Sequence, residues 1–333
     1  MRTRPLGEGG FEVSEVGLGC WQLGGDWGER APDARRARAI LEAAAEAGVT
    51  FLDTADVYGD GRSERAVGAF LAGADAPVRV ATKFGRAGGV YPDGYTREAL
   101  RRGAAASRER LGVEAIDLLQ LHCVPAEVLR AGRVFDWLRE LRDEGVVRHF
   151  GASVETIEEG LLCLREPGLQ SLQVIVNVLR PQALDELVPR AEAAGVGVIA
   201  RVPLASGVLA GKFVPNVSAE AAFAKTDHRN FNRDGEAFNV GETFAGLPFG
   251  EAVELVRELE RAFVPRGMPT ARFALRWLLD QPGVTTVIPG ASSWRQARAN
   301  AEAAAADPLD AELLARVDAW SRERAAGVVR GAV

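Results

Sequence analysis

The sequence has few cysteines, no excess of basic residues and no long apolar run. Its 333 residues include three cysteines, Cys20, Cys123 and Cys163, whose spacing forms neither an even disulfide framework nor a set of metal ligands. The net charge of −6 argues against a nucleic-acid partner, because a phosphate-binding surface needs a basic excess. No apolar run reaches membrane-spanning length, and the first residues, MRTRPLGEGGFEV, lack the apolar core of a signal peptide. We therefore expect a reduced, cytoplasmic protein with no metal, membrane or nucleic-acid partner.

What the sequence does contain is a repeated pattern of strand and helix. Apolar runs, typical of parallel strands buried on both faces, alternate with amphipathic segments that stop at a glycine. A doubly wound sheet usually has fewer strands and a glycine-rich phosphate fingerprint after its first strand. The pattern favours an α/β fold of the (β/α)8 TIM-barrel type, in a single domain over residues 1–333. The eight predicted strands are Val16–Leu18, Thr50–Leu52, Val78–Thr82, Ile116–Leu121, Val147–Ala152, Leu172–Asn177, Gly197–Ala200 and Val284–Ile288.

Three parts of the chain lie outside this repeat. Residues Thr3–Leu6 and Phe11–Val13 predict an N-terminal β-hairpin, and Ser293–Ala304 and Asp310–Ala325 predict extra C-terminal helices. The longest non-repeating segment, residues 213–248, is polar but carries spaced phenylalanines. A loop of this length is usually a functional lid or a mobile insertion, and the aromatic residues favour a lid that packs on the barrel.

The stretch TFLDTADVYGDGRSERAVGAFL carries the strongest chemical signal. Asp53 stands at a strand tip, and Tyr58 follows in a glycine-rich turn before a helix whose expected N-cap is Ser63. Lys83 and His122 follow the next two apolar runs directly. Each residue alone also fits a structural role, such as a turn cap or a strand-end cation. Because the active sites of parallel barrels lie at the C-terminal ends of the strands, we expect the four side chains to converge on one mouth.

These residue types suit proton transfer to a carbonyl. A free phenol has a pKa of about 10, which is too high for efficient proton transfer at neutral pH. An adjacent ammonium stabilises the phenolate and lowers that pKa, and a carboxylate holds the ammonium in place. A neutral imidazole can orient the carbonyl oxygen. The arrangement needs no metal and no nucleophile, so the hydride must come from a cofactor.

Three other motifs are weaker signals. GLGCWQLGG resembles a dinucleotide fingerprint, but Gln22 occupies the position of the third glycine and we expect no helix there. His122 and Cys123 together with Cys20 lack the paired spacing of metal ligands. The basic stretch DHRNFNR has acidic neighbours and fits a solvated face or a clasp over a cofactor pyrophosphate.

Motifs along nearly the whole chain resemble those of the aldo-keto reductases. They are FLDTADVYGDGRSE, VATKFG, IDLLQLH, VRHFGAS, GVGVIARVPLASGVLAGKF and VTTVIPGASSWRQARAN, in this order. The resemblance implies a (β/α)8 barrel that binds NADP(H), or less often NAD(H), across the strand tips. It also implies that Asp53, Tyr58, Lys83 and His122 form a catalytic tetrad, with Tyr58 as general acid in reduction and base in oxidation.

The same resemblance implies a set of cofactor contacts. The adenosine end would lie at the N-terminus of a helix, where backbone N–H groups favour phosphate. The implied cofactor-binding residues are Asp53; Trp21, near the nicotinamide; Ser153 and Gln173, at the carboxamide; Pro203, Leu204, Ser206, Gly207 and Lys212, around the pyrophosphate; and Gly290, Ser292, Gln296 and Asn300, at the adenosine end.

Three positions depart from the family pattern. Val154 replaces an asparagine that often binds the carboxamide. Arg201 stands where an aromatic ring often stacks on the nicotinamide; a guanidinium can also stack, but its charge disfavours the oxidised ring, so we expect Arg201 to bias binding toward the reduced cofactor. Ser292 replaces a basic residue, which Arg295 or Arg298 could supply. NADP(H) is therefore favoured, and NAD(H) stays open.

The sequence predicts an NAD(P)(H)-dependent oxidoreductase that reduces aldehydes, ketones or sugar-like carbonyls to alcohols, with a small-molecule substrate. A second interpretation is an NAD-linked dehydrogenase of sugars or other secondary alcohols. A third is a cofactor-binding regulatory subunit resembling the potassium-channel β-subunits, which share this barrel. Loops set the substrate, and their sequences do not identify it.

Overall fold

Eight parallel strands form the central sheet and follow one another in chain order. The computed structural model describes residues 1–25, 32–74, 77–213 and 218–333. Bridges between Val16 and Val287 and between Gly19 and Gly290 join the first strand to the last and close the sheet into a barrel. All eight predicted strands are confirmed, with limits that shift by at most three residues. They are β3 (Leu18–Gly19), β4 (Phe51–Asp53), β5 (Arg79–Phe84), β6 (Ile116–His122), β7 (Val147–Ser153), β8 (Leu169–Ile175), β9 (Gly197–Arg201) and β10 (Val284–Val287).

The predicted N-terminal hairpin is also present. Strands β1 (Thr3–Pro5) and β2 (Glu12–Ser14) pair in antiparallel fashion. Leu6 and Val13 are fully buried and pack against barrel side chains that include Phe51 and Leu118. Phe51 begins its strand, so the hairpin fills the end of the barrel at which the strands begin.

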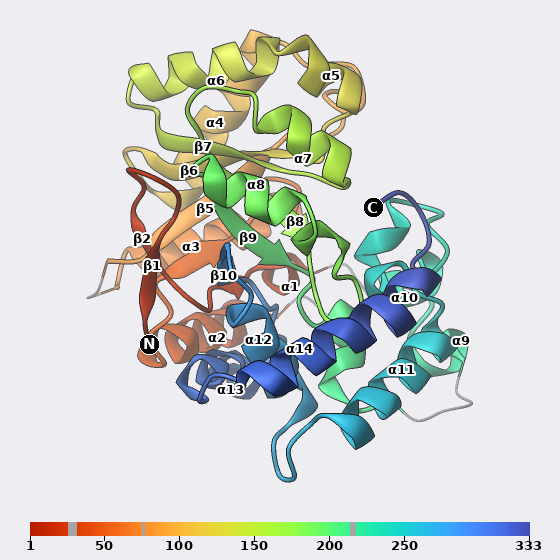
Figure 1. The fold of residues 1–333 in the computed structure, drawn as a ribbon. Coiled ribbons are helices and arrows are strands. Elements are labelled where there is room, and N and C mark those ends of the chain that lie inside the picture. The colour runs from red at the N-terminus through yellow and green to blue at the C-terminus, as the bar shows by residue number, and fades with distance from the viewer. Residues whose placement is uncertain (26–31, 75–76, 214–217) are drawn as a thin grey trace.

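Helices surround the strands (Figure 1). Helix α4 shows how the sequence sets their limits: Thr96 caps its first turn, Leu100 and Leu111 are buried, and Gly112 ends it with a φ of 66° that favours glycine. The α-helices outside residues 213–248 are α1 (Trp21–Gly24), α2 (Ala34–Glu46), α3 (Arg62–Leu71), α4 (Arg97–Leu111), α5 (Ala126–Ala131), α6 (Arg133–Asp143), α7 (Ile157–Cys163), α8 (Leu187–Ala193), α11 (Phe249–Ala262), α12 (Thr270–Leu279), α13 (Trp294–Ala301) and α14 (Ala311–Trp320). Shorter turns are η1 (Gln182–Leu184), η2 (Ala205–Ala210), η5 (Glu302–Ala305), η6 (Ser321–Ala325) and η7 (Ala326–Val328).

Two local predictions were wrong. Ser63 is not the N-cap of its helix: Gly61 is, and the Ser63 hydroxyl instead donates to the Cys20 carbonyl at 2.8 Å while accepting from Thr54. Burial of Ser63 beside the first strand explains the difference, because its hydroxyl satisfies a barrel carbonyl that water cannot reach. We expected no helix after the first strand, but the single turn α1 begins at Trp21.

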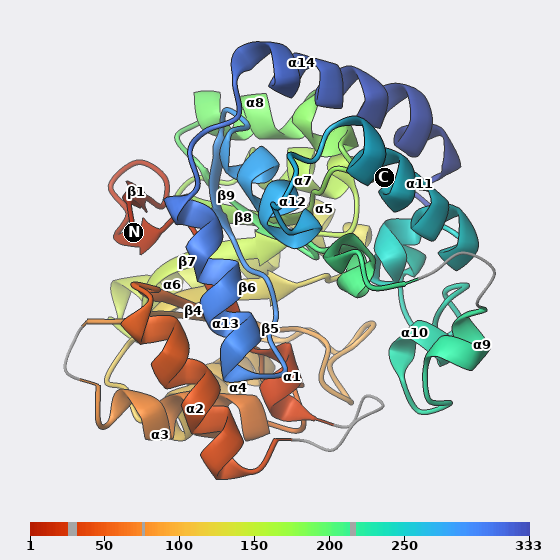
Figure 2. The ribbon, with the colours of Figure 1, turned by 90° about the horizontal axis from the view of Figure 1, so that it is seen from below.

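The long segment 213–248 packs as short helical turns. We call residues 218–248 the lid segment; residues 214–217 lie outside the described residues. Its turns are α9 (Ala219–Ala222), α10 (His228–Phe231), η3 (Val240–Glu242) and η4 (Phe244–Gly246), and Figure 2 shows α9 and α10 on the same side of the molecule as α11. Phe223 and Phe244 contact Phe249 of α11, with ring centroids 5.5 and 4.9 Å apart, as expected of aromatic residues that pack the segment. Within the described ranges, no helix has the length and apolar character needed to cross a membrane.

Candidate active site

Asp53, Tyr58, Lys83 and His122 come from three neighbouring strands and one turn. Asp53 ends β4, Lys83 lies near the end of β5, and His122 ends β6. Tyr58 lies in the turn between β4 and α3. Because β4, β5 and β6 are adjacent and parallel, their C-terminal ends bring the three side chains to the same mouth of the barrel.

Lys83 links the carboxylate to the phenol. Its ammonium is 1% exposed and donates to Asp53 Oδ1 at 2.5 Å, to the Thr54 carbonyl at 2.9 Å and to the Tyr58 hydroxyl at 3.2 Å. All three ammonium protons therefore have acceptors. A buried ion pair is stable only when its remaining hydrogen-bonding capacity is satisfied, and this one is.

Two glutamines complete the surroundings of Asp53. Gln120 donates to Asp53 Oδ2 at 3.1 Å, and Gln173 donates to the same oxygen at 2.7 Å. The sequence predicted Gln173 as a carboxamide contact and missed Gln120. Gln120 lies two residues before His122 in β6, and this spacing places the two side chains on the same side of the strand. The alternation of side chains between the two faces of a strand could have identified Gln120 from the sequence.

Burial decides the acidity of Tyr58. We expected the ammonium to lower the pKa of the phenol, but burial raises that pKa to about 12, and Lys83 offsets only part of the rise. The direction of the Lys83 effect is as expected, but the net pKa is raised, because the phenolate loses more hydration on burial than one ammonium restores. Burial disfavours the Lys83 ammonium too, but Asp53 and Tyr58 together outweigh burial and raise the pKa of Lys83.

His122 is a neutral imidazole at the edge of the site. Its ring meets the Tyr58 ring edge-on, with centroids 5.8 Å apart. Burial and the nearby cations Lys83, Arg86 and Arg201 hold the pKa of His122 well below its usual value. Its buried Nδ1 has no hydrogen-bond partner among the described residues. A neutral ring can donate a hydrogen bond without carrying charge, which suits the role expected of His122 from the sequence.

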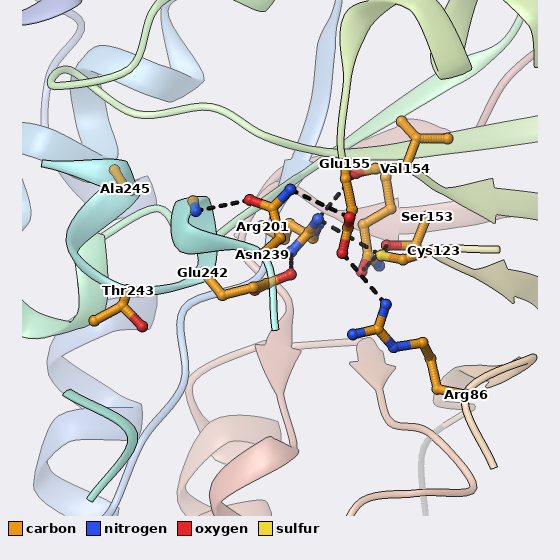
Figure 3. Close-up of polar contacts among 12 residues, drawn as sticks. Arg86, Cys123, Ser153, Val154, Glu155, Arg201, Asn239, Glu242, Thr243 and Ala245 are labelled. Carbon is orange, nitrogen blue, oxygen red and sulfur yellow. Dashed lines mark hydrogen bonds and ion pairs between the residues drawn. The ribbon is translucent and has the colours of Figure 1, made fainter. Parts of the chain in front are cut away.

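Arg201 lies across the mouth from the tetrad, at the end of β9. It is 7% exposed and donates from one terminal nitrogen to the Val154 carbonyl at 2.9 Å and to Cys123 Sγ at 3.7 Å. The other terminal nitrogen pairs with Glu242 of the lid segment (Figure 3). The Arg201 Nε is buried without a partner among the described residues. Glu242 was not predicted, and no local pattern marks it.

Glu155 joins the same group of charges. Arg86 approaches one of its carboxylate oxygens at 3.4 Å, and Asn239 of the lid segment donates to the other at 3.2 Å (Figure 3). Burial raises the pKa of Glu155, and Arg201 opposes that rise. We call Arg86, Glu155, Arg201 and Glu242 the charged rim. It contains two cations and two carboxylates, so its formal charges balance.

Cys123, Glu155 and Glu242 place potential ligand atoms within 4.8 Å of one another. Arg201 already donates to the thiol and to Glu242. A guanidinium at this place repels a metal cation, so the three residues do not fit a metal centre.

The predicted pyrophosphate loop follows β9 directly. Val202, Ala205 and Ser206 adopt left-handed backbone angles, with φ values of 52°, 47° and 55°, and Gly207 follows at 90°. Such strained runs are typical of ligand-binding turns. The Ser206 hydroxyl donates to the Glu242 carbonyl and accepts from the Phe244 amide. In this structure the hydroxyl therefore binds the backbone of the lid segment. Pro203 and Leu204 lie within the turn, and Lys212 is exposed beyond it.

The predicted adenosine end lies at the start of α13. Gln296 accepts from the Ser292 amide at 2.8 Å, and Asn300 donates to the Gly290 carbonyl at 3.2 Å. These side chains brace the loop between β10 and α13. Arg36 of α2 donates to the Ser292 carbonyl from two nitrogens, at 3.0 and 2.6 Å.

Arg36 is therefore a cation beside the position where the family pattern has a basic residue. The sequence offered Arg295 and Arg298 instead. Arg295 lies over the Trp294 ring, and Arg298 lines a hollow that Met1 also lines. Arg36 is distant in sequence, so nothing near Ser292 could have revealed it.

The lid segment also reaches Trp21. The His228 ring meets the Trp21 indole edge-on, with centroids 4.5 Å apart. Burial lowers the pKa of His228 to about 4, so this ring is neutral at pH 7. Trp21, predicted near the nicotinamide, therefore lies between the barrel and the lid segment.

Comparisons with known proteins identify the family of this chain and its structural neighbours. Residues 15–322 match the model of the Aldo/keto reductase family. The chain is 30% identical over 335 residues to the uncharacterised oxidoreductase YqkF of Bacillus subtilis (strain 168), covering 97% of each chain. The aldo-keto reductase AKR11C1 from Bacillus halodurans, in its holo form, matches with a TM-score of 0.77 and 27% identity over 99% of this chain and 98% of that one. The glycerol dehydrogenase AKR11B4 from Gluconobacter oxydans matches with a TM-score of 0.78 and 26% identity, with the same coverage.

Proposed function

Because the chain belongs to the aldo/keto reductase family, we propose that it is an NAD(P)(H)-dependent oxidoreductase that reduces aldehydes, ketones or sugar-like carbonyls to alcohols. One observation carries this proposal. The buried Lys83 ammonium bonds both Asp53 and the Tyr58 hydroxyl, beside the neutral ring of His122. This is the arrangement that protonates a carbonyl oxygen without a metal.

The family uses nicotinamide cofactors, and the mouth of this barrel fits one. His122 Nδ1, Arg201 Nε and Gln120 Oε1 are buried polar atoms without partners in the described part of the chain, as expected where a polar ligand binds. A Cβ at Gly207 would lie 3.9 Å from its nearest neighbour, the Arg229 side chain, so that turn leaves room for close approach of a ligand. When bound, the nicotinamide supplies or accepts the hydride.

The chain's own groups handle the proton. Tyr58 is protonated at neutral pH and gives its proton to the carbonyl oxygen during reduction. Lys83 stabilises the phenolate that forms, and Asp53 keeps the ammonium charged and in place. Neutral His122 orients the carbonyl oxygen. In oxidation the same phenol must first lose its proton.

For cofactor contacts we propose the residues that the family pattern implies. Trp21, Asp53, Ser153, Gln173 and Arg201 would surround the nicotinamide end. Pro203, Leu204, Ser206, Gly207 and Lys212 would hold the pyrophosphate, and Gly290, Ser292, Gln296 and Asn300 the adenosine end. Arg36 beside Ser292 supports a preference for NADP(H), because a guanidinium suits the additional phosphate.

The charged rim favours a hydroxylated substrate over an apolar one. Glu155 and Glu242 can accept hydrogen bonds from hydroxyl groups, and Arg86 can donate. The similarity to a glycerol dehydrogenase keeps a second candidate in view, a dehydrogenase of sugars or other secondary alcohols that runs mainly in oxidation. Both candidates use the same site in opposite directions.

The test compares Tyr58→Phe with the wild-type protein in turnover and in cofactor binding. We expect Tyr58→Phe to lower carbonyl reduction by about 10²-fold or more, with NADPH affinity nearly unchanged, because the phenol supplies only the proton. Tyr91→Phe is the matched control, since Tyr91 is 44% exposed and lies outside the tetrad. A parallel fall in affinity and turnover would make Tyr58 a binding or structural residue. Wild-type binding of NADPH without turnover of a panel of aldehydes, ketones and sugars would favour a regulatory subunit.

A further inference from the structure

Glu242 is the partner of a buried arginine at the proposed nicotinamide position. Arg201 projects from the end of β9, and its guanidinium is surrounded by the Val154 carbonyl, the Cys123 thiol and the Glu242 carboxylate (Figure 3). Among these neighbours only Glu242 carries a full negative charge. The ion pair with Glu242 therefore determines how strongly the positive charge of Arg201 acts on a ligand bound at the barrel mouth.

The lid segment, and not the barrel, places this carboxylate. Glu242 ends η3, and its backbone carbonyl accepts from the Ser206 hydroxyl at 3.0 Å. Three residues earlier, Asn239 donates to Glu155 at 3.2 Å. Two separate contacts with the barrel thus fix the short turn that carries Glu242.

The four charges of the rim balance only when Glu242 is included, and the buried Arg180, which interacts with Arg201, Glu155 and Glu242, adds a further cation nearby. Arg86 and Arg201 supply two positive charges, and Glu155 and Glu242 supply two negative charges. Glu155 already binds Arg86 and Asn239, so it cannot replace Glu242 without giving up those contacts. Removal of the Glu242 charge would leave a net positive charge beside the nicotinamide position.

We propose that Glu242 neutralises Arg201 and thereby sets the relative affinity of this protein for the oxidised and reduced nicotinamide cofactor. The inference rests on the proposed function, which puts Arg201 beside the nicotinamide. The oxidised ring is a cation and the reduced ring is neutral, so an unpaired guanidinium weakens binding of the oxidised form alone. The sequence suggested that Arg201 by itself favours the reduced cofactor; with Glu242 in place, that preference is largely cancelled.

The experiment measures the dissociation constants of NADP+ and NADPH, and of NAD+ and NADH, with the full-length protein. The readout is the ratio of the constant for the oxidised form to that for the reduced form. Glu242→Gln should raise this ratio about tenfold, because it keeps the shape of the side chain and removes its charge. Arg201→Gln should lower the ratio, since the carboxylates then attract the oxidised ring. The double variant should return toward the wild-type ratio.

Glu220→Gln is the control within the lid segment. Glu220 is an exposed carboxylate that pairs with Arg233, away from the rim, so its loss should leave the ratio unchanged. Glu242→Asp keeps the charge and should keep the wild-type ratio. If it shifts the ratio as Glu242→Gln does, placement of the lid segment is responsible and the inference is wrong.

The outcomes separate the inference from the proposed function. If the wild-type protein binds both forms and Glu242→Gln and Arg201→Gln leave the ratio within about twofold, the charge argument is overturned while the oxidoreductase assignment stands. If the wild-type protein binds no nicotinamide cofactor, the proposed function fails first. If Glu242→Gln does not fold, Glu242→Ala, which also removes the charge, takes its place and should raise the ratio in the same direction.

Discussion

The charges around Asp53 and those around Arg201 lie at the same barrel mouth but are held in different ways. Asp53 is bound by Lys83, Gln120 and Gln173, and all three donors lie in barrel strands. Arg201 also begins in a strand, but its anionic partner Glu242 comes from the lid segment. The surroundings of Asp53, which we call the tetrad side, are therefore built from barrel strands. The surroundings of Arg201, which we call the rim side, are completed by the lid segment.

Under the proposed function, this difference separates the residues that transfer the proton from those that bind the cofactor. The side chains that bind Asp53 all come from barrel strands, so we expect the geometry of the tetrad side to be independent of the lid segment. The rim side depends on whether the lid segment occupies its place. The C-terminal tail contributes here, since Arg330 donates to the Arg233 and Gly246 carbonyls and pairs with Asp234. We expect substitutions on the first side to affect proton transfer and those on the second to affect cofactor binding.

The largest effect on turnover should follow from removing Lys83, the cation that the barrel strands hold beside Tyr58. Lys83→Met should lower turnover by about 10²-fold or more in both directions, because nothing then stabilises the Tyr58 phenolate. It should also destabilise the fold by about 3–5 kcal/mol, since it leaves the Asp53 carboxylate buried without a cation. Thermal or denaturant unfolding measures this loss. The double variant Asp53→Asn/Lys83→Met should regain stability and remain inactive.

The pH dependence of turnover tests the tetrad side in the wild-type protein. With the pKa of Tyr58 at about 12, the phenol stays protonated through the neutral range, so reduction should not fall until the pH approaches that value. Alcohol oxidation needs the phenolate, so log kcat/KM should rise by about one for each pH unit without a plateau below about pH 10. A plateau below pH 8 would show that ligand binding reverses the effect of burial on Tyr58.

Removing contacts that hold the lid segment, and with it the rim side, should have a smaller effect. Arg330→Ala removes side-chain hydrogen bonds to three lid carbonyls, those of Arg233, Gly246 and Leu247, and an ion pair to Asp234. We expect a several-fold rise in the cofactor dissociation constant and faster proteolysis within residues 218–248, with the pH profile unchanged. Arg324→Ala is the control, because Arg324 pairs with Glu258 on α11. Equal effects of the two variants would mean that the tail stabilises the whole protein and not the lid segment.

The smallest effect should fall on cofactor preference. Arg36 is exposed, so its interaction with a phosphate would be screened by solvent. Arg36→Met should reduce the preference for NADPH over NADH about threefold or more, as measured by the two dissociation constants. Arg298→Met should leave that preference unchanged. A loss confined to Arg298→Met would restore the assignment made from the sequence.

The tetrad was predictable because each member directly follows an apolar run or lies in the adjoining turn. In a parallel barrel those positions share one face, so local pattern alone brought Asp53, Lys83 and His122 together. Gln120 obeys the same strand period and was missed only because it lies inside the run. No such rule predicts the positions of Glu242 and Arg36. The folding of the lid segment places Glu242, and the packing of α2 on α13 places Arg36. Their roles stay predictions until the variants are measured.

The sequence by itself determined the barrel, the order of its strands and the convergence of four polar side chains, because alternating apolar runs and glycine stops are local signals. The tertiary structure alone decided which charges are paired and how far burial shifts them. The pKa of Tyr58 illustrates this: its neighbours were known from the motif, but the extent of its burial was not. Electrostatic free energies depend on distance and hydration, and both are properties of the folded chain.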